Sequence, residues 1–482
     1  MKTITRRTLL KSMVSGMATC AISQNTQASI AKKPNIIYIN IDDMGWTDLG
    51  FMGSKFYQTP NIDRLAKQGI TFSNAYAPAA NCAPSRASCL TGQYPPRHGI
   101  YTVASSERGK AQHRKLIPTK NRTVLADDKI TIAEVLQQGG YKTCHIGKWH
   151  LGQDPKTQGF DYNIGGSAAG HPSSYFSPYK NKALSDGDAG EQLTDRLSDE
   201  AIGFMQNHVS EPFFLHLAYY AVHTPLQAKK QLIEKYKNKS TTKAHSNAVY
   251  AAMIETLDNN IGRVMQAIDQ LGLADNTFIL FSSDNGGLFR VSRQYPLRAG
   301  KGSYYEGGIR EPLIVRWPGK IKPGSHSETP VSGIDFFPTF LDAAGLAKPE
   351  KLTLDGLSLM PILTGSGNLP TRPLYWHFPV YLQVGNVDTP DPLFRTRPGS
   401  AMRFGQWKLH QYFEDGRIEL YKLDDDIGEK HNLVKSHPAK AQELLDMMKK
   451  WRAKTKAPVP DKLNPKYDYE SESKAIKNLS NR

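Results

Sequence analysis

The chain has 482 residues, enough for one large domain and a smaller one, and its four cysteines are too few for a disulfide-stabilised scaffold. Its formal net charge of +16 favours a polyanionic partner, with a solvated basic surface that only aids solubility as the alternative. We expect no nucleic acid to bind, because the sequence contains no aromatic-basic repeat, zinc pattern or other nucleic-acid module.

Residues 1–31 have the features of an export signal. A basic segment containing Arg6-Arg7 precedes a mildly apolar run over residues 13–22, and small residues near position 28 offer cleavage sites. The arginine pair resembles a twin-arginine signal, which indicates a periplasmic or secreted protein. No stretch reaches the roughly 20 apolar residues of a membrane span, so we predict no transmembrane segment. The residues before Cys20 match a lipid-attachment site poorly, and we expect no lipid anchor there.

A buried strand is predicted over residues 34–43, and it ends in Asp42 and Asp43. Open α/β sheets place their sites at such strand ends. Two adjacent carboxylates there repel each other unless a cation lies between them, although strand-end acids also cap helices and start turns. We therefore infer a metal site.

A short helix is predicted to begin at Cys82, within residues 81–92 (Asn-Cys-Ala-Pro-Ser-Arg-Ala-Ser-Cys-Leu-Thr-Gly). Pro84 suits the first helical turn because it lacks an N–H group. The N–H groups at the start of a helix favour an anion, and Arg86 lies one turn further on. The pattern predicts an anion site at Cys82, and an ordinary helix with a buried cysteine is the alternative.

Two further predicted strands lead into histidines. The strand over residues 141–146, after a helix over 131–138, is followed by Gly-Lys-Trp-His with Lys148 and His150. Extended backbone would project both side chains to one face, which suits anion binding and proton transfer. The strand over residues 213–220 leads to His223-Thr224-Pro225, where the proline stiffens the loop.

A second pair of metal-ligand candidates follows the strand that begins at residue 276, namely Asp284 and Asn285. With Asp42 and Asp43 they offer only oxygen donors, which select a hard cation, and Ca²⁺ suits them somewhat better than Mg²⁺. A long helix precedes this strand over residues 246–271, and we expect His245 to be exposed before it.

A glycine-rich loop over residues 297–312 carries Lys301 between glycines, which lets the backbone approach an anion. We expect Glu306 and Arg310 to pair with each other. From residue 401 the pattern changes to short strands at 401–404, 407–410 and 418–421, followed by a helix over 438–451 and a loosely ordered polar tail. We expect Cys89 and Cys144 to be buried free thiols, with a bridge between them as the alternative.

These motifs together resemble those of the type I, formylglycine-dependent sulfatases, over about residues 33–433. The matching motifs are Cys-x-Pro-x-Arg from Cys82, Gly-Lys-Trp-His, His-x-Pro, and Lys-Gly followed by Glu-Gly-Gly-x-Arg-x-Pro from Lys301. The resemblance implies an alkaline-phosphatase-like α/β sandwich with a large mixed central sheet and a small C-terminal antiparallel sheet-and-helix subdomain. We assign residues 1–31 to the signal, 32–395 to the catalytic domain, 396–456 to the subdomain and 457–482 to the tail.

The resemblance also implies a mechanism. A formylglycine-generating enzyme would oxidise Cys82 to formylglycine (3-oxoalanine), whose hydrate attacks sulfur with Arg86 nearby. Residue 82 would then join Asp42, Asp43, Asp284 and Asn285 around the divalent cation. Lys148 and Lys301 would stabilise the sulfate charge. His223, or alternatively Lys301, would protonate the departing alcohol, and His150 would deprotonate the second hydroxyl of the hydrate.

The expected substrate is a sulfated polysaccharide or its oligosaccharides, of carrageenan, ulvan or glycosaminoglycan type. Two alternatives remain: a phosphomonoester or phosphonate ester hydrolase of the same fold, and a non-catalytic binder of sulfated glycans. The candidates to line substrate subsites are Arg108, Arg114, Lys115, Arg293, Arg395, Arg397, Arg403 and His377.

Overall fold

The computed structural model describes residues 32–383 and 391–480. The export signal predicted for residues 1–31 lies outside the described residues. From Lys33 onward the chain forms one compact unit. Among the described residues, no helix is both long enough and apolar enough to cross a membrane.

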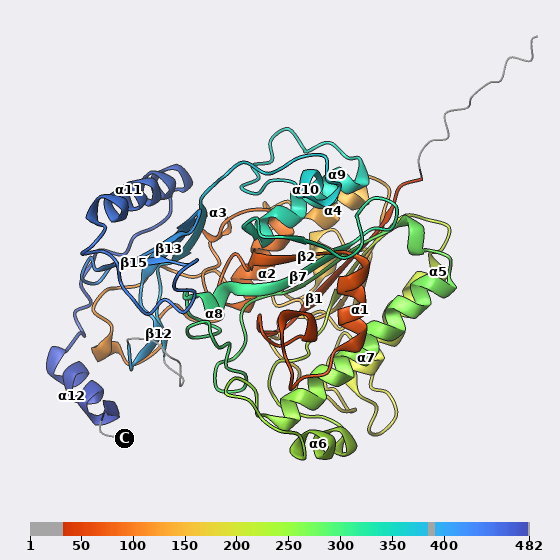
Figure 1. Cartoon of the computed structure of the whole chain (residues 1–482), viewed down its shortest axis with the longest axis horizontal. Helices are drawn as coiled ribbons and strands as arrows, with labels where there is room; N and C mark the ends of the chain where they lie inside the picture. The colour runs from red at the N-terminus through yellow and green to blue at the C-terminus, as the bar shows by residue number, and fades with distance from the viewer. Residues whose placement is uncertain (1–31, 384–390, 481–482) are drawn as a thin grey trace, which may run out of the picture. The chain divides into compact units, whose positions relative to one another are not determined.

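A nine-stranded mixed sheet forms the centre of this unit, as predicted (Figure 1). The five strands β4, β3, β5, β1 and β6 run parallel, and β7 is antiparallel to β6 and to β2. In spatial order the strands are β4 (Tyr162–Ile164), β3 (Lys142–Gly147), β5 (Phe213–Ala218), β1 (Asn35–Ile41), β6 (Thr277–Ser283), β7 (Arg310–Arg316), β2 (Ile70–Tyr76) and β8 (Ser325–Ser327), with β9 (Val331–Ser332) also paired to β2.

The strand β1 lies between β5 and β6 and is buried along its whole length. Ile37 and Ile39 pack into one hydrophobic core and Ile36 and Tyr38 into another, because successive side chains of a strand point to opposite faces. A central parallel strand covered on both faces therefore reads as a continuous apolar run, which is the pattern found in the sequence.

Helices cover both faces of the sheet (Figure 1). One core contains residues of α1 (Pro60–Gln68), α5 (Leu193–Asn207), α6 (Lys230–Lys237) and α7 (Ala248–Gln270). The other contains residues of α2 (Cys82–Thr91), α4 (Ile132–Gln138), α9 (Phe336–Ala344) and α10 (Met360–Leu363). The short helices α3 (Pro95–His98) and α8 (Glu306–Ile309) lie in loops. The free, buried Cys89 and Cys144 match the prediction.

His245, before α7, is buried, so the expectation that it is exposed was wrong. Its side chain packs against the ring of Tyr57, with Nε2 3.2 Å from the hydroxyl of Thr47. The residues that cover it come from a loop almost two hundred positions earlier in the chain.

A smaller antiparallel sheet follows in the chain. Its strands are β10 (Leu374–Phe378), β13 (Gly399–Phe404), β14 (Trp407–Tyr412) and β15 (Ile418–Lys422). The helix α11 (Pro438–Thr455) packs on it through Leu444 and Met448, which meet Leu409 and Leu420 in one core. The two-stranded pair β11 (Leu382–Gln383) and β12 (Phe394–Thr396) lies between β10 and β13 in the chain.

The C-terminal segment is more ordered than expected. It contains the helix α12 (Tyr469–Ser480), whose Glu472 side chain accepts a hydrogen bond from Arg397 at 2.6 Å and another from Tyr467 at 2.7 Å. The expectation of a loosely ordered tail beyond residue 456 was therefore wrong.

A buried network of charges ties β14 to the loop that carries α8. The predicted pair of Glu306 and Arg310 is present, at 3.1 Å. The Lys408 Nζ lies 2.8 Å from Glu306 and 3.0 Å from Glu429, and none of these three side chains is exposed. Lys408 pairs with both Glu306 and Glu429, so its loss would leave each carboxylate with less positive charge nearby.

Substitution of Lys408 by Met is expected to lower the free energy of unfolding by about 3–5 kcal/mol, because it leaves two buried carboxylates short of a counter-charge. Lys422→Met removes a partly exposed pair with Asp425 and is the matched control, with an expected loss below about 1 kcal/mol. Urea unfolding of both variants measures the difference. Equal losses would contradict a structural role for the buried network.

His98 makes stability depend on pH. Its Nδ1 accepts a hydrogen bond from the Ile100 N–H group, so the Nε2–H group faces Ser88, and burial lowers the pKa to about 3 from 6.5. The unfolded chain binds the proton near pH 6.5, whereas the folded chain does not, so stability falls as the pH drops from about 6.5 to 3.

Between pH 6.5 and 4 this single group is expected to contribute about 3 kcal/mol to that loss. The variant His98→Asn cannot take up this proton and should lose correspondingly less. The measurement is the free energy of unfolding of both proteins, from urea titrations at pH 6.5 and pH 4. The same pH-dependent loss in both would show that His98 titrates normally in the folded protein.

Candidate active site

The carboxyl ends of β1, β3, β5 and β6 meet at one edge of the central sheet, because these four neighbouring strands are parallel. The loops that follow them therefore gather the polar residues predicted from the sequence. These are Asp42 and Asp43 after β1, Lys148 and His150 after β3, His223 after β5, and Asp284 and Asn285 after β6.

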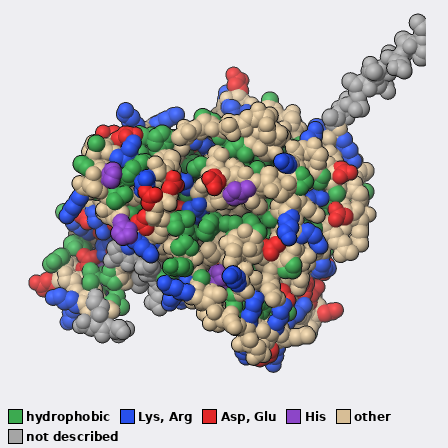
Figure 2. Space-filling model, viewed as in Figure 1, with side chains coloured by type: hydrophobic (Ala, Val, Ile, Leu, Met, Phe, Trp, Pro, Cys, Tyr) green, Lys and Arg blue, Asp and Glu red, His purple; other side chains and the backbone are tan. Residues whose placement is uncertain are grey.

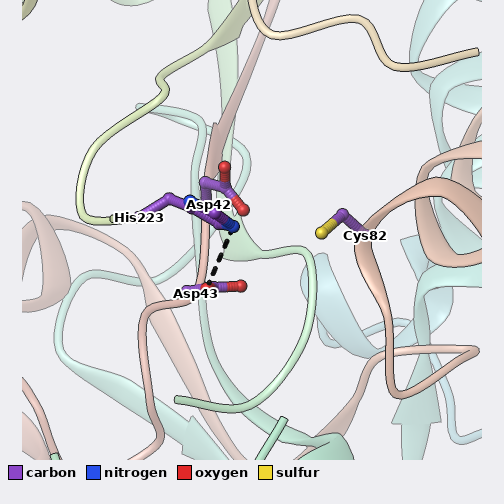
Figure 3. Close-up of side chains that lie close together, drawn as sticks. All are labelled: Asp42, Asp43, Cys82 and His223. Atoms are coloured by element: carbon purple, nitrogen blue, oxygen red, sulfur yellow. Dashed lines mark ion pairs between the residues drawn. The ribbon is translucent and has the colours of Figure 1, made fainter. Parts of the chain in front are cut away.

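Three acids are buried together at this edge. The Asp43 N–H group donates to Asp284 Oδ1 at 3.2 Å, and Asn285 Nδ2 donates to Asp43 Oδ1 at 2.9 Å. Asp43 has φ 63°, a left-handed conformation that is uncommon outside glycine. One ligand atom each from Asp42, Asp43, Cys82 and His223 lie within 4.8 Å of one another, and the Cys82 thiol points toward the two carboxylates (Figure 3).

Two buried oxygen atoms at this position have no hydrogen-bond partner among the described residues, Asp42 Oδ1 and Asn285 Oδ1. Unsatisfied buried polar atoms are rare and costly. Burial raises the pKa of Asp42 to about 8, although Lys148 opposes the shift. A divalent cation would supply the missing partner, and the oxygen-rich donor set fits one.

The helix α2 begins at Cys82, as predicted, and every residue in it is buried. Arg86 donates from Nε to Asp284 at 2.8 Å and from Nη1 to the Lys148 carbonyl at 2.9 Å, so it joins the loops after β6 and β3. Burial raises the pKa of the Cys82 thiol, opposed by the charges of Lys148 and Lys301. The unmodified thiol is thus uncharged at neutral pH and a weak nucleophile.

Two lysines flank the acids. Lys148 Nζ lies 2.6 Å from Asp42, and Lys301 Nζ lies 2.5 Å from Asp43. Gly147 allows the chain to turn before Lys148, because it has φ 98° and a Cβ there would come within 2.0 Å of the Ala218 carbonyl. Although burial opposes it, the Lys301 ammonium lowers the pKa of Asp43, with a further contribution from His223.

His150 reaches the site by a route that differs from the prediction. Its φ is 64°, so the backbone is not extended there, and its N–H group donates to the Ser167 carbonyl at 2.9 Å. The half-buried ring nevertheless lies where the charges of Lys148 and Arg86 act on it. Burial, together with these charges, holds its pKa well below the usual range, and Nδ1 has no partner among the described residues.

His223 has a defined tautomer when neutral. Its Nδ1–H group donates to the Thr224 carbonyl at 2.6 Å, which leaves the Nε2 lone pair 3.6 Å from an Asp43 oxygen. Burial lowers its pKa to about 4, although Asp43 raises it. Both site histidines are therefore neutral at pH 7 and able to accept a proton or a metal ion.

Several residues beside the site belong to no sequence motif and were therefore not predicted. The ring of His171 stacks on His223, with 6.0 Å between centroids and 7° between planes. A pocket of about 450 Å³ beside it is also lined by Lys180 and Lys182. Only the folded chain brings this segment next to His223, because no sequence pattern links the two.

Four of the eight residues suggested for substrate subsites have other roles. Arg114 binds the carbonyls of Glu107 and Gly109, and Arg397 pairs with three carboxylates. Arg403 is buried against Tyr76 and Asn74, and His377 lies between Ser400 and the Pro458 carbonyl. These four suggestions were wrong, because nearby groups from distant parts of the chain already satisfy each side chain. Lys115 is half-buried and Arg293 is exposed.

Comparison with known proteins identifies the family. A family model described as Sulfatase matches residues 34–346, and one described as N-sulphoglucosamine sulphohydrolase, C-terminal, matches residues 300–457. A sulfatase of Formosa agariphila is 34% identical over 90% of this chain and 90% of its own length. Human N-acetylgalactosamine-6-sulfatase is 33% identical over 71% of this chain and 68% of its own.

The solved structure of Ps i-CgsB in complex with k-i-k-neocarrahexaose has a TM-score of 0.73 and 32% identity, and covers 93% of this chain and 98% of its own. Together with the mixed central sheet and the small C-terminal sheet, this likeness gives the alkaline-phosphatase-like architecture that was predicted. The chain belongs to the sulfatase family and is a sulfuric ester hydrolase.

Proposed function

We propose that the chain is an exported sulfatase that removes sulfate esters from a sulfated polysaccharide or its oligosaccharides. The observation that carries the proposal is the position of Cys82. Its side chain lies at the start of a buried helix and faces Asp42 and Asp43, while the charges of Lys148 and Lys301 reach it. An anionic ester bound there meets positive charge together with a site for a nucleophile.

The nucleophile in this proposal is residue 82 after oxidation to formylglycine by a formylglycine-generating enzyme. One hydroxyl of the hydrated aldehyde loses its proton and forms a bond to sulfur, while the bond from sulfur to the alcohol oxygen breaks. The second hydroxyl then gives up its proton, the aldehyde reforms, and sulfate leaves with the oxygen that attacked. Water rehydrates the aldehyde and completes the cycle.

The surrounding residues supply charge and protons. Lys148 and Lys301 offset the negative charge on the sulfate oxygens, and Arg86 holds the loops around them in place. His223 takes up the proton of the attacking hydroxyl at its Nε2 lone pair and delivers it to the departing alcohol; alternatively the Lys301 ammonium donates that proton. His150, whose neutral ring has one nitrogen without a partner among the described residues, accepts the proton of the second hydroxyl.

A divalent cation fits the acid cluster, with Asp42, Asp43, Asp284, Asn285 and the modified residue 82 as the residues that would hold it. We favour Ca²⁺ over Mg²⁺, because the donors are oxygens in an irregular arrangement. When bound, such an ion would act as a Lewis acid that offsets negative charge on oxygen.

A sulfated polysaccharide is the substrate class that the charge and the relatives support best. Lysine and arginine side chains are spread over the face seen in Figure 2, mixed with acidic ones, and the net charge is +16. The relative Ps i-CgsB was solved with k-i-k-neocarrahexaose, and another relative is named for N-acetylgalactosamine 6-sulfate. We infer a substrate of carrageenan, ulvan or glycosaminoglycan type, met in the periplasm or outside the cell.

A phosphonate or phosphate monoester hydrolase is the second candidate function. The phosphonate monoester hydrolase of Agrobacterium radiobacter covers 89% of this chain with a TM-score of 0.67, but it is 20% identical, so the likeness concerns the fold alone. Release of phosphate in excess of sulfate from matched esters would favour this candidate.

The proposal predicts an aldehyde at residue 82. Protein made together with a formylglycine-generating enzyme should show the thiol-to-aldehyde mass change in the tryptic peptide 68–86, and it should release sulfate from 4-nitrophenyl sulfate. Cys82→Ala should abolish release. Cys89→Ala, which alters a buried free thiol of the same helix, should retain it. Converted protein that binds sulfated glycans but releases no sulfate would instead favour the non-catalytic binder.

The acid cluster predicts stabilisation by a divalent cation. At a concentration about 100-fold above the dissociation constant, CaCl₂ should stabilise EDTA-treated protein by about 2.7 kcal/mol, seen as a rise in Tm by calorimetry. MgCl₂ should give a smaller rise at the same concentration. Asn285→Ala should reduce the rise, whereas Asn238→Ala, at an exposed helix end, should not. If neither CaCl₂ nor MgCl₂ changed the Tm, the cation site would be contradicted.

A further inference from the structure

Two arginines, Arg395 and Arg108, lie near the loop of Lys301, and the charge of a third, Arg290, reaches Arg395. Arg395 stands on β12 between the buried Phe394 and Thr396, so it points to the opposite face of that strand. Its Nη1 lies 3.4 Å from the Lys301 carbonyl oxygen. Gly302 makes this approach possible, since a Cβ at that position would come within 3.0 Å of the Arg395 side chain.

Within the described part of the chain, no ion pair neutralises the charge of this arginine group. No described carboxylate forms an ion pair with Arg395, Arg108 or Arg290, whereas Arg397, two residues further on, pairs with Asp391, Glu414 and Glu472. The Nε of Arg395 is buried and has no hydrogen-bond partner among the described residues. Burial lowers the pKa of Arg395, and the charges of Arg108 and Arg290 lower it further against the pull of Asp43.

Arg108 is held in a defined orientation. Its Nε–H group donates to Gln383 Oε1 at 2.7 Å, and Gln383 belongs to β11, the partner strand of β12. Its two terminal nitrogens form no hydrogen bond to a described residue. A guanidinium fixed through Nε presents those nitrogens to a ligand, and such a planar pair matches the oxygens of a sulfate or a carboxylate.

We propose that Arg395 and Arg108 form a second anion subsite, which binds a further sulfate or carboxylate of the substrate while its neighbouring sulfate ester is cleaved. This inference rests on the proposed sulfatase function. It specifies the substrate as a saccharide with two anionic groups close together, on one sugar unit or on adjacent units. The sulfate released then comes from a densely charged segment of the glycan.

The test compares ligands that carry one or two anionic groups. Galactose 6-sulfate, a disulfated galactose and a 6-sulfated disaccharide with a uronic acid are measured as competitive inhibitors of 4-nitrophenyl sulfate turnover, so even a saccharide that is not cleaved gives an inhibition constant. The proteins compared are wild type, Arg395→Met and Arg108→Met. Arg64→Met, on the exposed side of α1, is the matched control.

Wild type should bind the saccharides with two anionic groups more tightly than the monosulfate. In Arg395→Met, the inhibition constant of the saccharides with two anionic groups should rise about tenfold more than that of the monosulfate. The reason is that charge-assisted hydrogen bonds to the second anionic group are lost. Arg64→Met should leave the ratio unchanged. Disulfated and uronate ligands that respond differently would identify the second group as sulfate or as carboxylate.

If Arg395→Met changed the inhibition constants of all the ligands by the same factor, the proposed subsite would be overturned. A wild-type protein that shows no preference for the second anionic group would overturn it as well. Failure of the proposed function has a separate signature, since protein carrying the aldehyde would then not turn over 4-nitrophenyl sulfate at all.

Discussion

The one-to-one pairing of three buried carboxylates with three cations is the constraint on which the site depends. Asp42 is paired with Lys148, Asp43 with Lys301, and Asp284 with Arg86. Like charges that lie close together in a low-dielectric interior repel strongly, so the partner of each acid lowers the cost of ionising it. The pairing also links the loops after β1, β3 and β6 to α2, because each cation comes from a different segment than its acid.

The same principle extends outward from the site. The loop that carries Lys301 continues into α8, where Glu306 is neutralised by Lys408 of the smaller sheet and by Arg310. The strand pair β11 and β12 places Arg395 against the carbonyl of Lys301. The smaller sheet and the strand pair inserted between β10 and β13 therefore hold one side of the site in place. The position of that side is fixed by charges rather than by apolar packing alone.

The sequence allowed the strand ends, the helix at Cys82 and the gathering of the acids to be predicted, since a buried parallel strand followed by polar residues is a local pattern. It did not reveal the backbone at His150, whose conformation depends on a hydrogen bond to Ser167 from a later loop. Nor did it separate Arg397 from Arg395. Arg397 is paired with three acids that lie 6, 17 and 75 positions away in the chain, so no local sequence pattern indicates these pairs. The buried His245 and the helix α12 were missed for the same reason.

The complete burial of α2 has a consequence for the life of the protein in the cell. Only 2% of Cys82 is exposed, and every other residue of that helix is buried as well. If residue 82 is oxidised as proposed, the buried thiol of the folded protein would be out of reach of the enzyme that oxidises it. Under the proposed mechanism, oxidation would therefore have to precede folding, and the rate at which the central sheet forms would set the time available for it. A variant that folds faster would emerge with a larger fraction of unconverted, inactive molecules.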